Sequence, residues 1–135
     1  FVLIAATYTP LCLLGLRGGG AVAVLVGIWA GATLGVVLGL VGIAEKRGVG
    51  LTLYLLMGWV AALSAPQMAE RLGPLNLGLI VAGGLAYTVG AIGLATNWPD
   101  PRPATFGYHE VWHTFTLVAG GCFAVVVWGL VLGAA

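Results

Sequence analysis

Long runs of apolar residues make up most of this chain, and short polar segments interrupt them at regular intervals. The apolar runs cover residues 1–16, 21–44, 49–65, 75–96 and 108–132. A helix needs about 20 mostly apolar residues to cross the hydrocarbon core of a bilayer, and glycine, proline and charged residues mark where these runs end. The pattern therefore predicts an all-α, polytopic transmembrane helical bundle with five spans, the first of them short.

Nearly all of the charged residues lie in the polar segments between the runs. Five spans place the two ends of the chain on opposite sides of the membrane, so the loops alternate between the sides. The positive-inside rule compares Lys46, Arg47 and Arg102 on one side with Arg17 and Arg71 on the other. The side with three basic residues is favoured as the cytoplasmic one over the side with two. The loops "EKRG" and "PDPRP", and hence the start of the last span, are therefore expected in the cytoplasm.

Composition supports an integral membrane protein and excludes some partners. Of the 135 residues, 61% are hydrophobic and only 7% are charged, with a mean hydropathy of +1.10, whereas soluble domains carry about 25% charged residues. A net charge of +1 offers no basic surface for nucleic acid. Cys12 and Cys122 lie inside apolar runs, so we expect both to act as small buried apolar residues and not to form a disulfide framework.

The chain starts inside an apolar run, at Phe1, so we expect that upstream helices of a longer protein are missing. No fixed repeat, low-complexity segment or linker divides the sequence, which predicts that residues 1–135 are one transmembrane domain or part of one. Two stripes of small residues recur every four positions: Gly27, Gly31, Gly35 and Gly39, then Gly78, Ala82, Ala86 and Gly90. Such stripes let helices approach closely. Packing within the bundle is the simpler interpretation, with a homodimer interface as the alternative.

Both histidines of the chain lie in "YHEVWHTF", at the start of the last apolar run. At 3.6 residues per turn, His109 and His113 are separated by about 40° around a helix and therefore share a face. Further along that face follow Thr116, Gly120 and Phe123, so the line is polar at its start and apolar at its far end. Because ionisable groups within a span avoid lipid, we expect the polar end to face the bundle interior or a water-filled cavity.

Zinc is the metal that this pair suggests first, because a helical i, i+4 pair can aim two imidazole nitrogens at one ion. The string also matches H-E-x-x-H, in which the glutamate of soluble metalloproteases is a general base. The alternative is a histidine pair at the membrane interface, with Glu110 solvated at the helix start and favoured by the helix dipole. A third ligand is difficult to find, because the other acidic residues lie in expected loops: Glu45, Glu70 and Asp100.

Three segments carry a resemblance to a known family. "FVLIAATYTPLCLL", "LYLLMGW" and "YHEVWHTFTLVAGGCFAVVV" together resemble the hemolysin III family of bacterial membrane proteins, relatives of the progestin and adiponectin receptors and of alkaline ceramidases. The resemblance implies a seven-helix bundle, of which this chain holds the third to seventh helices. It also implies a zinc ion held by one histidine on the second helix and by the positions of His109 and His113 on the seventh.

On this resemblance, the second-helix histidine and an aspartate beside the zinc lie upstream of Phe1, and Glu110 loses its role as a general base. The function implied is a zinc-dependent, ceramidase-like hydrolase of a lipid amide or ester in the bacterial plasma membrane. The alternative is a non-enzymatic protein, either a pore-forming or haemolytic factor or a sensor with a structural zinc. The sequence identifies neither the substrate, the catalytic residues nor the oligomeric state.

Overall fold

A computed structural model describes residues 1–44, 46 and 48–133 of the chain. The helices are α1 (Val2–Pro10), which continues into the π-helical turn η1 (Leu11–Gly15), then α2 (Gly18–Leu40), α3 (Val49–Trp59), the 3-10 turn η2 (Val60–Ser64), α4 (Ala65–Thr96) and α5 (Tyr108–Val131). Within the described ranges the only β-type pairing is an isolated bridge between Arg102 and Phe106. The prediction of an all-α fold is confirmed.

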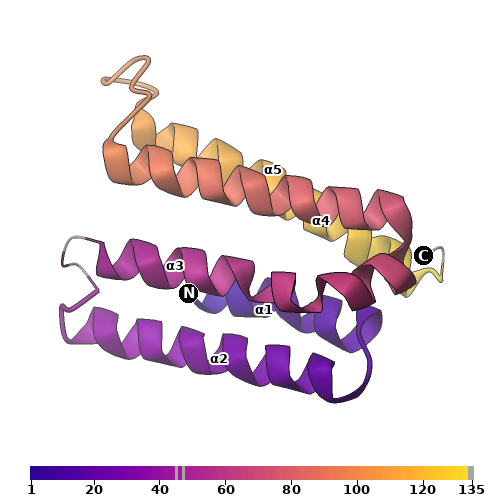
Figure 1. Ribbon diagram of the computed structural model, residues 1–135. Helices are drawn as coiled ribbons and strands as arrows, with labels where there is room; N and C mark the ends of the chain where they lie inside the picture. The colour runs from indigo at the N-terminus through magenta and orange to yellow at the C-terminus, as the bar shows by residue number, and fades with distance from the viewer. Residues whose placement is uncertain (45, 47, 134–135) are drawn as a thin grey trace.

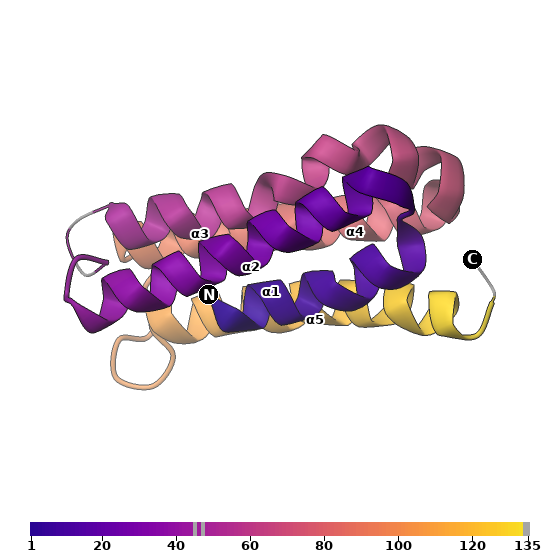
Figure 2. The ribbon, with the colours of Figure 1, turned by 90° about the horizontal axis from the view of Figure 1, so that it is seen from below.

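The helices lie side by side along one common direction, and successive helices alternate in direction (Figure 1). The end of α2, the start of α3 and the loop between α4 and α5 lie at one end of the bundle. The connection from η1 to α2 and the end of α5 lie at the other. Packing is most extensive between α4 and α5, and seen from below α1 runs alongside α5 (Figure 2).

Three helical stretches of the described chain are long and apolar enough to cross a membrane: Gly18–Leu40, Val49–Thr96 and Tyr108–Val131. The first helix, Val2–Gly15, is apolar but shorter. The 48 residues of Val49–Thr96 run as α3 in one direction and return as α4 in the other (Figure 1). The chain is therefore an integral membrane protein with several passes.

The structure corrects the interpretation of residues 66–74 as a loop. Residues 65–72 are helical, and α4 continues beyond them after a kink at Gly73, whose φ of 72° and ψ of 166° are not helical. Met68 and Leu72 are buried in the core that α1 and α2 share, which explains why this segment forms a helix despite its charges. The turn is confined to Gly73 and Pro74. The second span also differs, beginning at Gly18 and ending at Leu40 instead of covering residues 21–44.

Two apolar clusters form the core. The larger joins α1, η1, α2, α3 and the start of α4, and the smaller joins Leu11 to Ala119, Phe123 and Val126 of α5. The hydroxyl of Tyr8 donates a hydrogen bond to the carbonyl of Gly58 and ties α1 to α3. Cys12 is buried and free, as expected of a small apolar residue.

The small-residue stripes pack only in part. On α2, a Cβ at Gly31 would meet Met57 and one at Gly35 would meet the ring of Phe1, whereas Gly27 and Gly39 face open space. On α4, the close approaches to α5 occur at Gly83 and Gly90. Gly78 and Ala82 are exposed, so among the described residues the first half of the stripe on α4 packs against no other helix, and a homodimer interface there stays a prediction. Spacing alone missed Gly83, because it lies outside the four-residue series.

Candidate functional site

The histidine pair lies in the first two turns of α5, directly after the proline-rich loop. The backbone N–H of Gly107 donates to Oε2 of Glu110 at 2.9 Å. Glycine has no side chain to return a bond, so only the glutamate half of a capping box is formed. This contact supports the interpretation of Glu110 as a carboxylate at the helix start, and it directs that side chain back along the chain.

The two imidazoles point toward one another. The Nε2 atoms of His109 and His113 are 3.0 Å apart, and the ring centroids are 4.7 Å apart with an angle of 74° between the planes. The pair therefore shares one face of α5, as its spacing predicts. The contact is also a hydrogen bond in which one ring nitrogen donates and the other accepts.

The separation of the two nitrogens fits a shared metal ion. Zinc binds imidazole nitrogen at about 2.0–2.1 Å with tetrahedral geometry, which places two ligand nitrogens about 3.3 Å apart. The observed 3.0 Å differs from that value by an amount that small side-chain rotations remove. His109 and His113 can thus supply two ligands to one zinc ion.

Burial along this face increases from the histidine end toward Phe123. His109 and His113 are exposed, Thr116 and Gly120 are half-buried, and Phe123 is buried. The described helices therefore leave the histidine end of this face uncovered, and the prediction that it faces the bundle interior or a water-filled cavity stays a prediction. The physical reason for the exposure is local, since α5 packs on α4 and η1 through its apolar positions and no described helix covers its first two turns on the histidine side.

The described residues do not supply a third ligand. They contain no group of three histidine, cysteine, aspartate or glutamate side chains that could hold a metal ion. Asp100 lies in the loop before α5, where its Oδ1 approaches the Cα of Gly107 so closely that an added Cβ would be 2.8 Å away. Glu70 is on the helical segment before Gly73, and Glu45 lies outside the described residues.

Trp112 is the residue at this site that the sequence reasoning missed. Its ring centroid lies 5.7 Å from that of His109 and 4.6 Å from that of His113. Its position one residue before His113 and three after His109 was the available signal, because residues three apart on a helix are neighbours.

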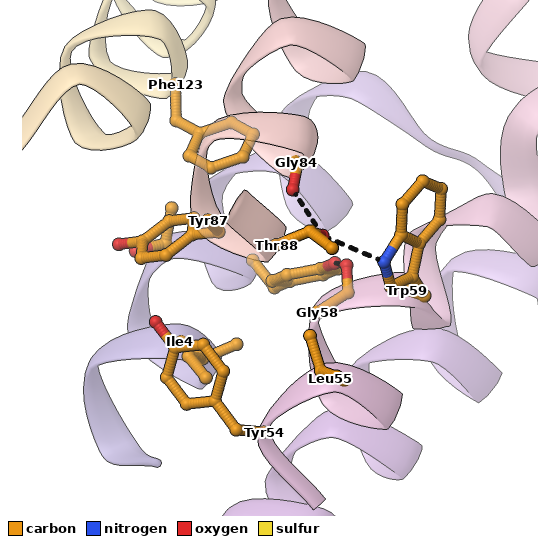
Figure 3. Close-up of a pocket in the computed structure, with 11 residues that line it drawn as sticks. Ile4, Tyr54, Leu55, Gly58, Trp59, Gly84, Tyr87, Thr88 and Phe123 are labelled. Atoms are coloured by element: carbon orange, nitrogen blue, oxygen red, sulfur yellow. Dashed lines mark hydrogen bonds between the residues drawn. The ribbon is translucent and has the colours of Figure 1, made fainter. Parts of the chain in front are cut away.

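An apolar cavity lies deeper in the bundle, between α1, α3, α4 and α5 (Figure 3). It adjoins a second space of about 170 Å³, and both are lined by Tyr8, Gly58, Trp59, Gly84 and Phe123. In Figure 3 the indole of Trp59 donates to Thr88 Oγ1, which in turn donates to the carbonyl of Gly84. Phe123 follows His113 by ten residues, which places the wall of the cavity that α5 forms about 15 Å further along the helix.

Comparison with known proteins matches the chain to one family of membrane proteins and to two relatives with related names. The family model described as "Haemolysin-III related" matches residues 1–124. "Hemolysin-3" of Bacillus cereus is 32% identical over 117 residues, which are 87% of this chain and 51% of that protein. "Hemolysin-3 homolog" of Bacillus subtilis (strain 168) is 32% identical over 125 residues, 93% of this chain and 55% of that protein. The chain thus spans about half the length of these relatives. No solved structure matches it.

Proposed function

The chain belongs to the haemolysin III family, and from that premise we propose that it forms part of a zinc-dependent hydrolase of a lipid amide or ester in the bacterial plasma membrane. One observation carries the proposal: the Nε2 atoms of His109 and His113 converge to 3.0 Å on a helix of an otherwise apolar bundle. Ionisable side chains are costly within spans and mark functional sites there. The Bacillus relatives support the choice of membrane.

In this proposal His109 and His113 hold the metal, and a third ligand comes from a part of the protein outside this chain. The relatives are about twice as long as the matched region, which leaves room for that ligand. A zinc ion with three protein ligands and one open position supplies Lewis-acid activation of water and of a carbonyl group. Additional helices would also cover the exposed imidazoles and exclude bulk water from them.

The apolar cavity fits the lipid part of such a substrate. Together with the adjoining space of about 170 Å³, which is lined by Leu11, Ile80 and Phe123, it offers contacts for an acyl chain, and ligand pockets are usually of this apolar kind with few polar groups. A chain that entered the cavity would leave its polar linkage about 15 Å away, near the level of His113. Of the hydroxyl groups that line the cavity, those of Tyr8 and Thr88 already donate to backbone carbonyls, so they could meet the substrate only as acceptors.

A pore is the alternative that the relatives' printed name suggests, but the hydroxyl groups of the spans do not favour it. Five of them donate to backbone carbonyls: Tyr8 to Gly58, Thr9 to Ala5, Thr33 to Trp29, Thr88 to Gly84 and Thr116 to His113. A conducting path needs polar groups that are free to replace water around an ion. A structural zinc differs from the proposed one by having four protein ligands.

The test uses the full-length gene product, purified in detergent. We expect about one zinc per protein by mass spectrometry, its loss in the double variant His109→Ala/His113→Ala, and its retention in the matched variant Thr114→Ala on the same two turns. Turnover of N-acyl and ester lipids should disappear with the metal. Zinc-free wild-type protein, or a double variant with unchanged zinc, would refute metal binding. Zinc without turnover of any lipid would favour the structural site, and ion flux into liposomes in the double variant would favour the pore.

A further inference from the structure

Trp112 lies against both histidines of α5. Its indole plane is inclined by 55° to the ring of His109 and by 53° to the ring of His113, at centroid distances of 5.7 and 4.6 Å. Aromatic rings attract one another at about 4.5–7 Å in such inclined arrangements. Apart from the imidazoles themselves, no other ring among the described residues contacts either histidine. Trp112 is therefore the one aromatic side chain that can restrain the pair.

The bundle holds Trp112 more firmly than it holds the imidazoles. Trp112 is half-buried, whereas both histidines are exposed. The indole also lines an apolar cavity of about 210 Å³ between α3, α4 and α5, together with Tyr54 and Ala91. On α4, Gly90 lies beside it, since a Cβ at that position would be in ordinary contact, 3.4 Å, with Cδ1 of Trp112. Packing on α4 thus determines the orientation of the indole without help from the histidines.

From this arrangement we infer that Trp112 is a positioning residue for the histidine pair, holding both imidazoles in the rotamers in which their Nε2 atoms converge. An exposed side chain on a helix samples several staggered rotamers, and it loses that freedom when it binds a ligand. A rigid indole in contact with both rings removes part of this freedom before the metal arrives. The inference rests on the proposed metal binding by His109 and His113.

A purely structural role for Trp112 makes a different prediction. If the indole only fills space between α4 and α5, its removal lowers the stability of the bundle and leaves the metal affinity of the folded protein unchanged. If it positions the imidazoles, the metal affinity and the ligand field of the bound metal change even in variants that remain folded. The shape of the replacement side chain also matters, because phenylalanine keeps a flat ring and leucine does not.

The experiment compares Trp112→Ala, Trp112→Leu and Trp112→Phe in the full-length gene product. Zinc dissociation constants come from competition with a chromogenic chelator, and the absorption spectrum of the cobalt-substituted protein reports ligand geometry. We expect alanine and leucine to weaken zinc binding roughly tenfold, the lower end of the effect of removing an outer partner of a metal-ligating histidine. Phenylalanine should restore most of the affinity. Trp128→Ala, an exposed position near the far end of α5, should leave both readouts at wild-type values.

Two results would overturn the inference alone: unchanged zinc affinity and cobalt spectrum in Trp112→Ala, or equal affinities in the leucine and phenylalanine variants. If the alanine variant does not fold, the comparison of the leucine and phenylalanine variants still tests whether Trp112 positions the imidazoles. Wild-type protein that binds no zinc would overturn the proposed function as well. The two failures are therefore distinguishable from one set of titrations.

Discussion

A methyl group added at Gly90 tests how closely α4 must approach α5 near the histidine pair. Gly90 is buried, and a Cβ built on it would lie 2.8 Å from the Cβ of Phe115. Because that atom is fixed to the backbone of α5, a change of rotamer cannot relieve the overlap. The two helices must separate locally by about 0.6 Å before the contact reaches the ordinary 3.4 Å.

The expected magnitude follows from two opposing terms. Replacing glycine with alanine inside a helix stabilises it by roughly 0.5–1 kcal/mol, while overpacking costs about 1–3 kcal/mol. Gly90→Ala should therefore lower the free energy of unfolding by about 1 kcal/mol, and by at most about 2.5 kcal/mol. Gly84→Ala is the matched control on the same helix, since nothing lies within 4 Å of its added Cβ, and it should be neutral or slightly stabilising.

Gly83→Ala is expected to fall between these two variants. Its added Cβ would lie 2.9 Å from Cζ of Phe123, the far end of a ring that can shift more easily than backbone. The free energies of unfolding would be measured by titrating the detergent-solubilised protein with a denaturing detergent while its helicity is followed by circular dichroism. A Gly90→Ala variant as stable as Gly84→Ala would show that the α4–α5 contact is not tightly packed at this level.

Three further predictions concern single contacts. Gly73→Ala should lower the free energy of unfolding by about 1–3 kcal/mol, because φ 72° and ψ 166° are accessible essentially to glycine alone. Gly78→Ala is the control, since nothing lies within 4 Å of its added Cβ. An effect at Gly73 no larger than that at Gly78 in the same titration would contradict the prediction. Glu110→Ala should lower the free energy of unfolding slightly, through loss of the helix-start contact, and leave the zinc content unchanged. Loss of metal on mass spectrometry would restore Glu110 to the site. Thr9→Val removes the acceptor of the indole N–H of Trp29, 3.1 Å away. A double-mutant cycle with Trp29→Phe should show a coupling energy of about 0.6 kcal/mol. A coupling energy of zero would mean that the bond is not formed in the bilayer.

The apolar runs were informative about the helices but not about every boundary. The proline-rich loop before α5 and the start of α5 at Tyr108 follow from the sequence, since three prolines exclude a continuous helix there. Residues 66–72 were assigned to a loop because the segment from Pro66 to Pro74 carries charges and a proline at each end. They form a helix because Met68 and Leu72 are buried in the core, and a hydropathy pattern does not reveal such partners across the bundle.

The shared face of the two histidines was predictable from the sequence, but their surroundings in the bundle were not. The i, i+4 spacing was sufficient to place His109 and His113 on one face of a helix, because helix geometry is local. The exposure of that pair and its contact with Trp112 depend on which neighbours α5 has. Those neighbours are set by packing between segments far apart in the chain.

Local patterns of residues were enough to establish that this protein is a multi-pass bundle of apolar helices with two imidazoles at one end of the last helix. Bilayer thickness and the 3.6-residue turn act on consecutive residues, and a pattern of apolar positions records both. The packing of the folded bundle was needed to establish where α4 and α5 approach closely, at Gly83 and Gly90, and that the two Nε2 atoms meet beside an indole. Close packing depends on the shapes of side chains that come together only when distant segments of the chain are assembled.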